Sequence, residues 1–128
     1  MPDTIQRRLA VGPGAPSEAR KLVSGIPLGD QARANLELIV SELVTNTVRH
    51  GSEPVGGELS VALRRDGERV SGEVCGRGPA FTWAAHDPDL EEPGGLGLMI
   101  VDRISDRWGI RRNTKVCVWF ECEDCAPD

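Results

Sequence analysis

The sequence lacks the features that would carry it into or across a membrane. No stretch approaches the roughly 18 to 20 consecutive apolar residues that span a bilayer. The first residues, 1–11, contain no apolar run and no small-residue cleavage site, so they do not read as a secretory signal. We therefore expect a cytoplasmic protein that makes no membrane contact.

An excess of positive charge is also missing. The formal net charge is −5, whereas a protein that binds the phosphate backbone needs a basic face. We therefore expect that the protein does not bind nucleic acid directly. The chain has neither internal repeats nor a low-complexity linker, and its 128 residues suit one domain, residues 1–128, with a core of its own.

Cysteine is scarce, and its pattern indicates no dedicated site. The four cysteines are Cys75, Cys117, Cys122 and Cys125. In a reducing cytosol the default state is the free thiol. Cys122 and Cys125 form a C-x-x-C pair, but a zinc site needs about four ligands and the sequence offers no second pair. We expect free thiols.

Helical periodicity is clearest in the first half of the chain. Residues 15–25 read as a short helix, with Pro16 near its first turn. From Gln31 to Arg49 the apolar residues recur at helical spacing, and Asp30 and Gly51 are suitable residues to begin and end that helix. Residues 95–106 predict a further helix.

Strand patterns occupy most of the remaining chain. Residues 4–11 read as a weak strand, and alternation around Asp66-Gly67 predicts a hairpin. Two last strands are expected near 107–112 and 116–123. Hairpins with intervening helices indicate an α+β fold, an α/β sandwich in which helices pack on one face of a mostly antiparallel mixed sheet.

Two polar residues on the long helix are candidates for chemistry. Glu42 and Asn46 are four positions apart, so they point the same way. A carboxylate can act as a base and a carboxamide can bind a metal ion. By themselves, however, they read more simply as the polar border of an amphipathic helix.

Glycines open the later helix, in the run Gly94-Gly95-Leu96-Gly97. Glycines at a helix start let a phosphate approach free backbone N–H groups, with the helix dipole helping. The simpler interpretation is a flexible loop end. The ordered set of both motifs, joined by a hairpin that ends in Gly76-Arg77-Gly78-Pro79, is more specific than either motif alone.

This ordered set resembles the anti-sigma-factor serine kinases of the actinobacterial type, a branch of the Bergerat-fold (GHKL, histidine kinase-like) ATPases. Residues 41–51, SELVTNTVRHG, look like the N-box of these kinases. Residues 74–81 and 94–101 resemble their G1 and G2 boxes. The segments 106–109 and 118–121 look like their closing strands, so the resemblance runs from about residue 15 to residue 121.

The resemblance implies a role for each matching residue. Asn46 would hold the Mg²⁺ that bridges the phosphates of ATP, and Glu42 would be the catalytic base that activates water or a partner's serine hydroxyl. Residues 81–93 would form the ATP lid. The remaining residues that it assigns to the nucleotide are Arg49, Gly78, Gly95, Leu96, Gly97, Leu98 and Thr114.

The G1 box departs from the family pattern, which reads Asp-x-Gly-x-Gly. Gly76 stands where the Asp would accept a hydrogen bond from the adenine amino group, and Ala80 stands where the last Gly would be. Loss of one charge-assisted hydrogen bond costs on the order of 1.5 to 3 kcal/mol. The G1 box is therefore degenerate, and the lid carries acidic residues but no Lys or Arg.

Several functions follow from these residues. The first is an ATP-dependent kinase that phosphorylates a serine on an anti-anti-sigma partner and otherwise sequesters a sigma factor. The alternative is a non-catalytic protein-interaction module of the same fold with weak or no ATP binding. A detached histidine-kinase catalytic domain and an unrelated α+β domain fit less well. Relatives of this type often form homodimers.

Overall fold

The fold is built on a five-stranded sheet in the order β1-β2-β3-β5-β4, in which all four strand pairings are antiparallel. The structure is a computed structural model, and it describes residues 3–50, 57–77, 93–112 and 115–123. The elements are β1 (Asp3–Ala10), α1 (Ala15–Val23), α2 (Asp30–His50), β2 (Glu58–Asp66), β3 (Arg69–Arg77), α3 (Pro93–Ile104), β4 (Arg107–Arg112) and β5 (Lys115–Cys122).

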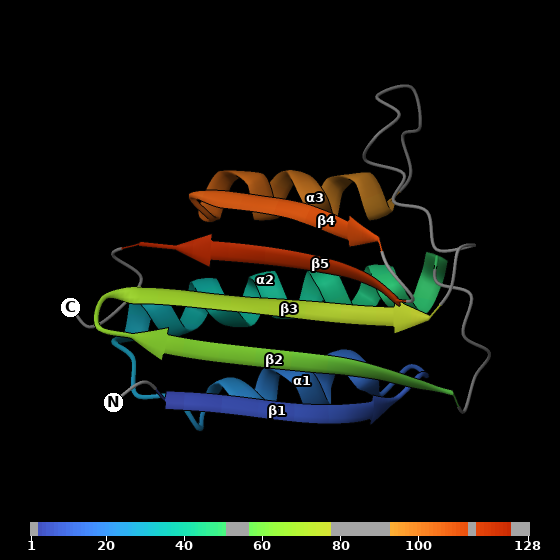
Figure 1. The fold of residues 1–128 in the computed structure, drawn as a ribbon, viewed down its shortest axis with the longest axis horizontal. Coiled ribbons are helices and arrows are strands. Elements are labelled where there is room, and N and C mark those ends of the chain that lie inside the picture. Colours follow the sequence, from blue (N-terminus) through green and yellow to red (C-terminus); the bar gives the residue numbers. More distant parts are fainter. Residues whose placement is uncertain (1–2, 51–56, 78–92, 113–114, 124–128) are drawn as a thin grey trace.

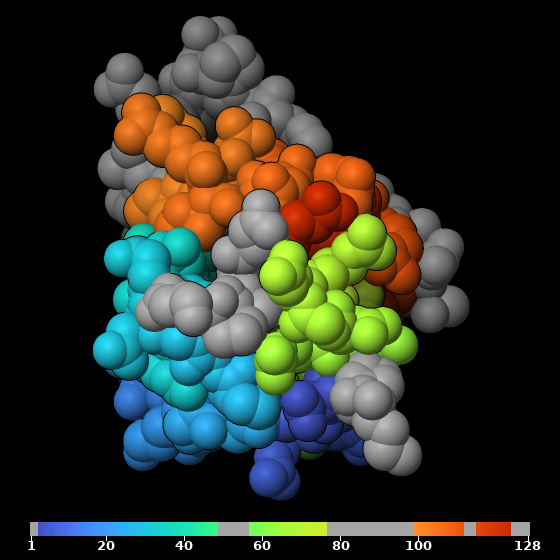
Figure 2. All heavy atoms as spheres, turned by 90° about the vertical axis from the view of Figure 1, so that its left-hand side faces the viewer, coloured from blue at the N-terminus to red at the C-terminus, as the bar shows by residue number. Residues whose placement is uncertain are grey.

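The three helices cover one face of this sheet, and α2 lies between α1 and α3 (Figure 1). Seen from one end, the helix layer and the strand layer lie side by side (Figure 2). Side chains alternate between the two faces of the sheet along each strand. On β5 the residues that face the helices are all buried: Val116, Val118, Phe120 and Cys122. The α+β fold with helices on one face is therefore confirmed.

The core lies between this sheet face and α2. Leu36, Ile39, Val40, Leu43 and Val44 of α2 are each no more than 1% exposed. Their spacing is the apolar stripe read from the sequence. No helix in the described part of the chain is long and apolar enough to cross a membrane.

Arg33 hydrogen-bonds the start of α2 to the end of α1. Arg33, in the first turns of α2, donates from Nη1 to the carbonyl oxygen of Val23 at 3.1 Å and from Nη2 to that of Ile26 at 3.4 Å. Val23 is the last residue of α1, and its carbonyl oxygen also accepts from the backbone N–H of Ile26 at 3.1 Å. The contact fixes where α2 begins relative to α1.

The C-terminal half of α3 is tied to β4. Trp108 packs against the core and donates from Nε1 to Asp102 Oδ1 of α3 at 2.8 Å. Beyond the helix, the backbone N–H of Asp106 donates to the carbonyl of Glu121 at 2.8 Å. Anchoring at this end leaves the glycine-rich first turns of α3 at the opposite end, beside the end of α2.

Charged residues connect the three strands β3, β4 and β5 at the end that carries the β2–β3 turn. Glu123 accepts from Arg69 and from Arg107, each at 3.1 Å, and Glu121 accepts from Arg107 at 2.8 Å. The hydrogen bond to Glu121, with the charges of Glu121 and Glu123, raises the pKa of Arg107 above its ordinary value. These contacts are exposed, so they mainly fix register.

The predicted elements are present, with shifts of one or two residues at their ends. The β2–β3 turn at Asp66-Gly67 is confirmed, and Gly67 has a φ of +64°, which glycine adopts without strain. The helix expected to begin at Gly95 begins at Pro93 instead. Proline is well suited to a first helical position, whereas the glycines that follow have low helix propensity and made the boundary look later.

Gly72 on β3 is required by close packing, and we expect Gly72→Ala to lower the free energy of unfolding by about 1 to 3 kcal/mol. A Cβ there would lie 2.7 Å from Cζ of the buried Phe120 ring and 2.9 Å from the carbonyl oxygen of Ala62. Urea denaturation measures the change. Ser71→Ala, on the opposite face of the same strand, is the control, and an equal loss in both variants would contradict the packing argument.

Candidate functional site

The C-terminal half of α2 carries the two residues that the sequence singled out. Glu42 is half-buried, and Asn46, one turn later, is only 2% exposed. A polar carboxamide this deeply buried is held in a defined position by its surroundings. Next to it, the hydroxyl of buried Thr47 donates to the carbonyl of Leu43 at 2.9 Å. This helix packs against both β3 and α3.

The first turns of α3 contain the G2-box residues. The backbone of Gly95, Leu96, Gly97 and Leu98 lies within the first two turns of a helix that begins at Pro93. The end of α2, the end of β3 and this start of α3 lie at the same end of the domain, on the right in Figure 1. The fold thus places the segments that resemble the N-box and the G2 box at one end of the domain, although about 50 residues separate them in sequence.

Gly76, near the end of β3, adds no side chain to this site. Gly76 pairs with Val116 of β5 and is buried on the helix-covered face of the sheet. It shares that face with Val74, because alternate residues of a strand point the same way. The position that resembles the adenine-binding Asp of the G1 box is therefore a glycine on this face.

Other predicted site residues lie wholly or partly outside the described residues. Gly78 and Thr114 are among them, and so is the predicted lid up to residue 92, including Ala80. Arg49 lies in the last turn of α2, and only its backbone is described. Their roles stay predictions.

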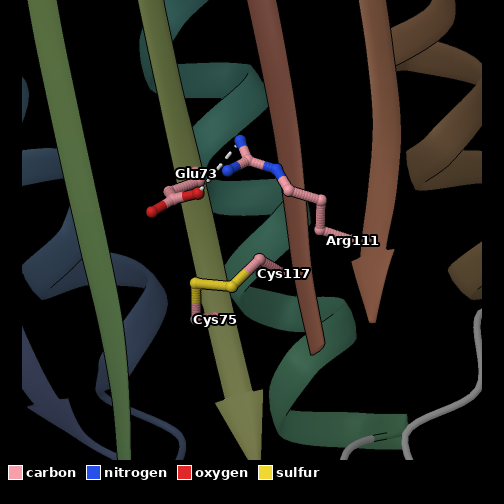
Figure 3. Close-up of a disulfide and its surroundings, with 4 residues drawn as sticks. All are labelled: Glu73, Cys75, Arg111 and Cys117. Atoms are coloured by element: carbon pink, nitrogen blue, oxygen red, sulfur yellow. Dashed lines mark ion pairs between the residues drawn. A yellow bond between two sulfur atoms is a disulfide. The ribbon is translucent and has the colours of Figure 1, made fainter. Parts of the chain in front are cut away.

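The prediction that the cysteines are free thiols was wrong. Cys75 of β3 and Cys117 of β5 are directly opposite each other, and a disulfide joins them (Figure 3). The two residues are 42 positions apart in sequence, so only the pairing of β3 with β5 makes them neighbours. Cys122 is also disulfide-bonded. Sequence reasoning missed the Cys75–Cys117 pair because strand order is a long-range property.

Two charged side chains accompany this disulfide on the face of the sheet away from the helices. Glu73 lies two residues before Cys75, and its Oε2 is 3.4 Å from Nη2 of Arg111 on β4 (Figure 3). A shallow depression of about 400 Å³ lies alongside, lined by Glu73, Arg111 and Trp119 among other residues. No described helix packs on this face, which we call the open face of the sheet (Figure 1).

The residues on the helix-covered side of the sheet suit the binding of a phosphate group better than the recognition of an adenine base. It offers a buried carboxamide, a half-buried carboxylate and glycines at a helix start. A family model described as the histidine kinase-like ATPase domain matches residues 9–122, which run from the end of β1 to the last residue of β5. Comparison with curated proteins gives no significant match.

Proposed function

The chain belongs to the histidine kinase-like ATPase domain family, a family of ATP-binding domains, and on that basis we propose that it is an anti-sigma-factor serine kinase. In this proposal it transfers the terminal phosphate of Mg-ATP to a serine of an anti-anti-sigma partner and sequesters a sigma factor in the cytoplasm. The observation that carries the proposal is the placement of Glu42 and Asn46 one turn apart on α2, beside the start of α3.

The phosphate end of the site fits a magnesium-bound nucleotide. Asn46 supplies a carboxamide oxygen, a hard ligand that Mg²⁺ accepts alongside phosphate oxygens and water. Its 2% exposure means that little rotamer freedom remains to be lost on binding. Gly95 and Gly97 remove side chains from the first turns of α3, so phosphate can approach the backbone N–H groups there.

Glu42 is suited to accept a proton. It is half-buried, so its carboxylate is partly shielded yet still reachable by a hydroxyl group from outside the domain. A base must lie within hydrogen-bond reach of the proton that it removes, and one helical turn separates Glu42 from the proposed metal ligand. In this role Glu42 would take the proton from the attacking serine or water, and an ion held by Asn46 would supply positive charge beside the phosphates.

Binding of Mg-ATP should raise the midpoint of thermal unfolding, and Asn46→Ala should abolish that rise. Nucleotide at ten times its Kd stabilises a domain by about 1.4 kcal/mol, which is roughly 4 to 7 °C at this size. The midpoint of each variant with Mg-ATP is compared with the midpoint of the same variant without it, so a loss of stability caused by the substitution itself does not affect the measured shift.

The matched control is Asn35→Ala, because Asn35 lies on the same helix and its Oδ1 accepts from Gln31 at 3.1 Å, three turns from Asn46. This variant should keep the full shift. A shift in the wild type that survives in Asn46→Ala would overturn the assignment of the metal ligand.

A second function, a non-catalytic protein-interaction module, is favoured by one specific observation. Gly76 provides no side chain on the face of β3 where the family reads adenine. In that case the fold is kept as a docking surface for sigma or anti-anti-sigma partners, or for a second copy in a homodimer. Absence of any thermal shift at millimolar Mg-ATP, with a folded protein, would select this function over the kinase.

A further inference from the structure

We propose that Cys75, Cys117 and Glu73 form, in the reduced protein, a binding site for a thiophilic divalent cation of the zinc class. We further propose that formation of the Cys75–Cys117 disulfide releases the ion. The site lies on the open face of the sheet, opposite the helices, and is separate from the proposed nucleotide site. It does not depend on ATP binding.

The geometry brings three ligand atoms together. The two Sγ atoms and one carboxylate oxygen of Glu73 all lie within 4.8 Å of one another. In a tetrahedral zinc site with Zn–S near 2.3 Å and Zn–O near 2.1 Å, ligand atoms are roughly 3.5 to 3.8 Å apart. Reduction and small rotations of the side chains reach that spacing without moving the strands.

The backbone holds these positions firmly. Cys75 and Cys117 are register partners within the β3–β5 pairing, with Cα atoms 4.0 Å apart, and two further pairs follow them toward the end of β3. Glu73 points to the same face because it is two residues from Cys75 on one strand. Three protein ligands leave the fourth position of a tetrahedral ion for water or an added ligand, and the depression lined by Glu73 and Arg111 lies beside the site.

The ligand set selects the class of ion. Two thiolates favour zinc, cobalt or cadmium and disfavour Mg²⁺, which prefers oxygen ligands. The charges also balance, because two thiolates, one carboxylate and the nearby Arg111 guanidinium sum with a divalent ion to zero. Arg111 is 3.4 Å from one oxygen of Glu73, and the carboxylate has a second oxygen for an ion.

The chemistry of the switch balances with common thiol reagents. Two small thiols, or one dithiol protein, reduce the disulfide by exchange, giving two protein thiols and one new disulfide on the reductant. Zn²⁺ then displaces two protons from the thiols. In the reverse direction, one hydrogen peroxide and two protons convert the zinc-bound thiolates to the disulfide, free Zn²⁺ and two waters.

The test uses the full chain with Cys122→Ser and Cys125→Ser, so that the C-x-x-C pair cannot bind the metal. After reduction and removal of the reductant, we expect one equivalent of Zn²⁺ to stay with the protein through gel filtration. Co²⁺ in its place should give a thiolate-to-cobalt charge-transfer band. Peroxide should release the zinc to a chromogenic chelator as the two thiols disappear. Failure of the reduced protein to retain zinc would overturn the proposal.

Single substitutions added to the Cys122→Ser, Cys125→Ser protein show whether a residue binds the ion directly or acts only through its charge. Cys75→Ser and Cys117→Ser should each abolish stoichiometric binding and the cobalt band. Glu73→Gln should lower zinc affinity by more than about tenfold. The matched control is Glu121→Gln, on the same face of β5 but paired with Arg107 at 2.8 Å, which should keep full affinity. Equal losses in Glu73→Gln and Glu121→Gln would show that Glu73 is not a ligand.

Discussion

Glu42→Gln should lower phosphate transfer by about 10² to 10⁴-fold while leaving Mg-ATP affinity unchanged. The substitution keeps the size and hydrogen-bonding shape of the side chain but removes its ability to accept a proton. Glu42 is half-buried on α2, so the glutamine should be accommodated without a change in packing. Single-turnover release of labelled phosphate, with water as the acceptor, measures the rate, and nucleotide titration measures the affinity.

The control for this prediction lies on the same helix. Glu37 is also half-buried on α2 but is more than a turn farther from the start of α3. Glu37→Gln changes the charge of the helix by the same amount and should turn over at the wild-type rate. If Glu42→Gln also turned over normally, Glu42 would not be the base; if both variants lost activity, the cause would be the charge of α2.

The elements were predictable because local patterns determine them. The long helix shows an apolar stripe at a period of 3.6, and β5 alternates strictly, with Val118 and Phe120 pointing into the core. The turn at Asp66-Gly67 follows from the backbone conformation that Gly67 adopts. Each of these features depends on residues within a few positions of one another.

Contacts between distant segments were not predictable in the same way. The placement of β5 between β3 and β4 depends on tertiary packing, and it alone makes Cys75 and Cys117 partners. The contact of Arg33 with the end of α1 likewise needs the angle between two helices. A strand pattern specifies which face a residue occupies, but it leaves open which strand lies beside it.

The candidate site also combines features that local sequence determines with features that depend on tertiary packing. The spacing of Glu42 and Asn46 was readable because both are on one helix, and their approach to α3 follows from the packing of the two helices. The glycine at position 76 was also visible in sequence. The structure adds that Gly76 is buried on the helix-covered face of β3, which gives this departure from the G1-box pattern a defined place in the fold.

Gly76→Asp should raise the affinity for ATP by roughly tenfold to over a hundredfold. One charge-assisted hydrogen bond contributes on the order of 1.5 to 3 kcal/mol, and each 1.4 kcal/mol corresponds to a factor of ten. The new carboxylate would extend from the buried face of β3, at the end of the domain where α2 and α3 meet. Isothermal titration of wild type and variant gives the two dissociation constants.

Comparison with a second nucleotide shows whether the gain comes from adenine. GTP has a carbonyl where ATP has its amino group, so Gly76→Asp should raise the ATP-to-GTP affinity ratio. Ser71→Asp adds the same charge to the open face of β3 and should leave both affinities as they are. An equal gain for both nucleotides, or a wild type that already binds as tightly as the variant, would mean that the adenine end was complete without a carboxylate at position 76. A gain confined to ATP would mean that the phosphate end, built on Asn46 and the α3 glycines, works in the wild type and that Gly76 alone weakens its affinity.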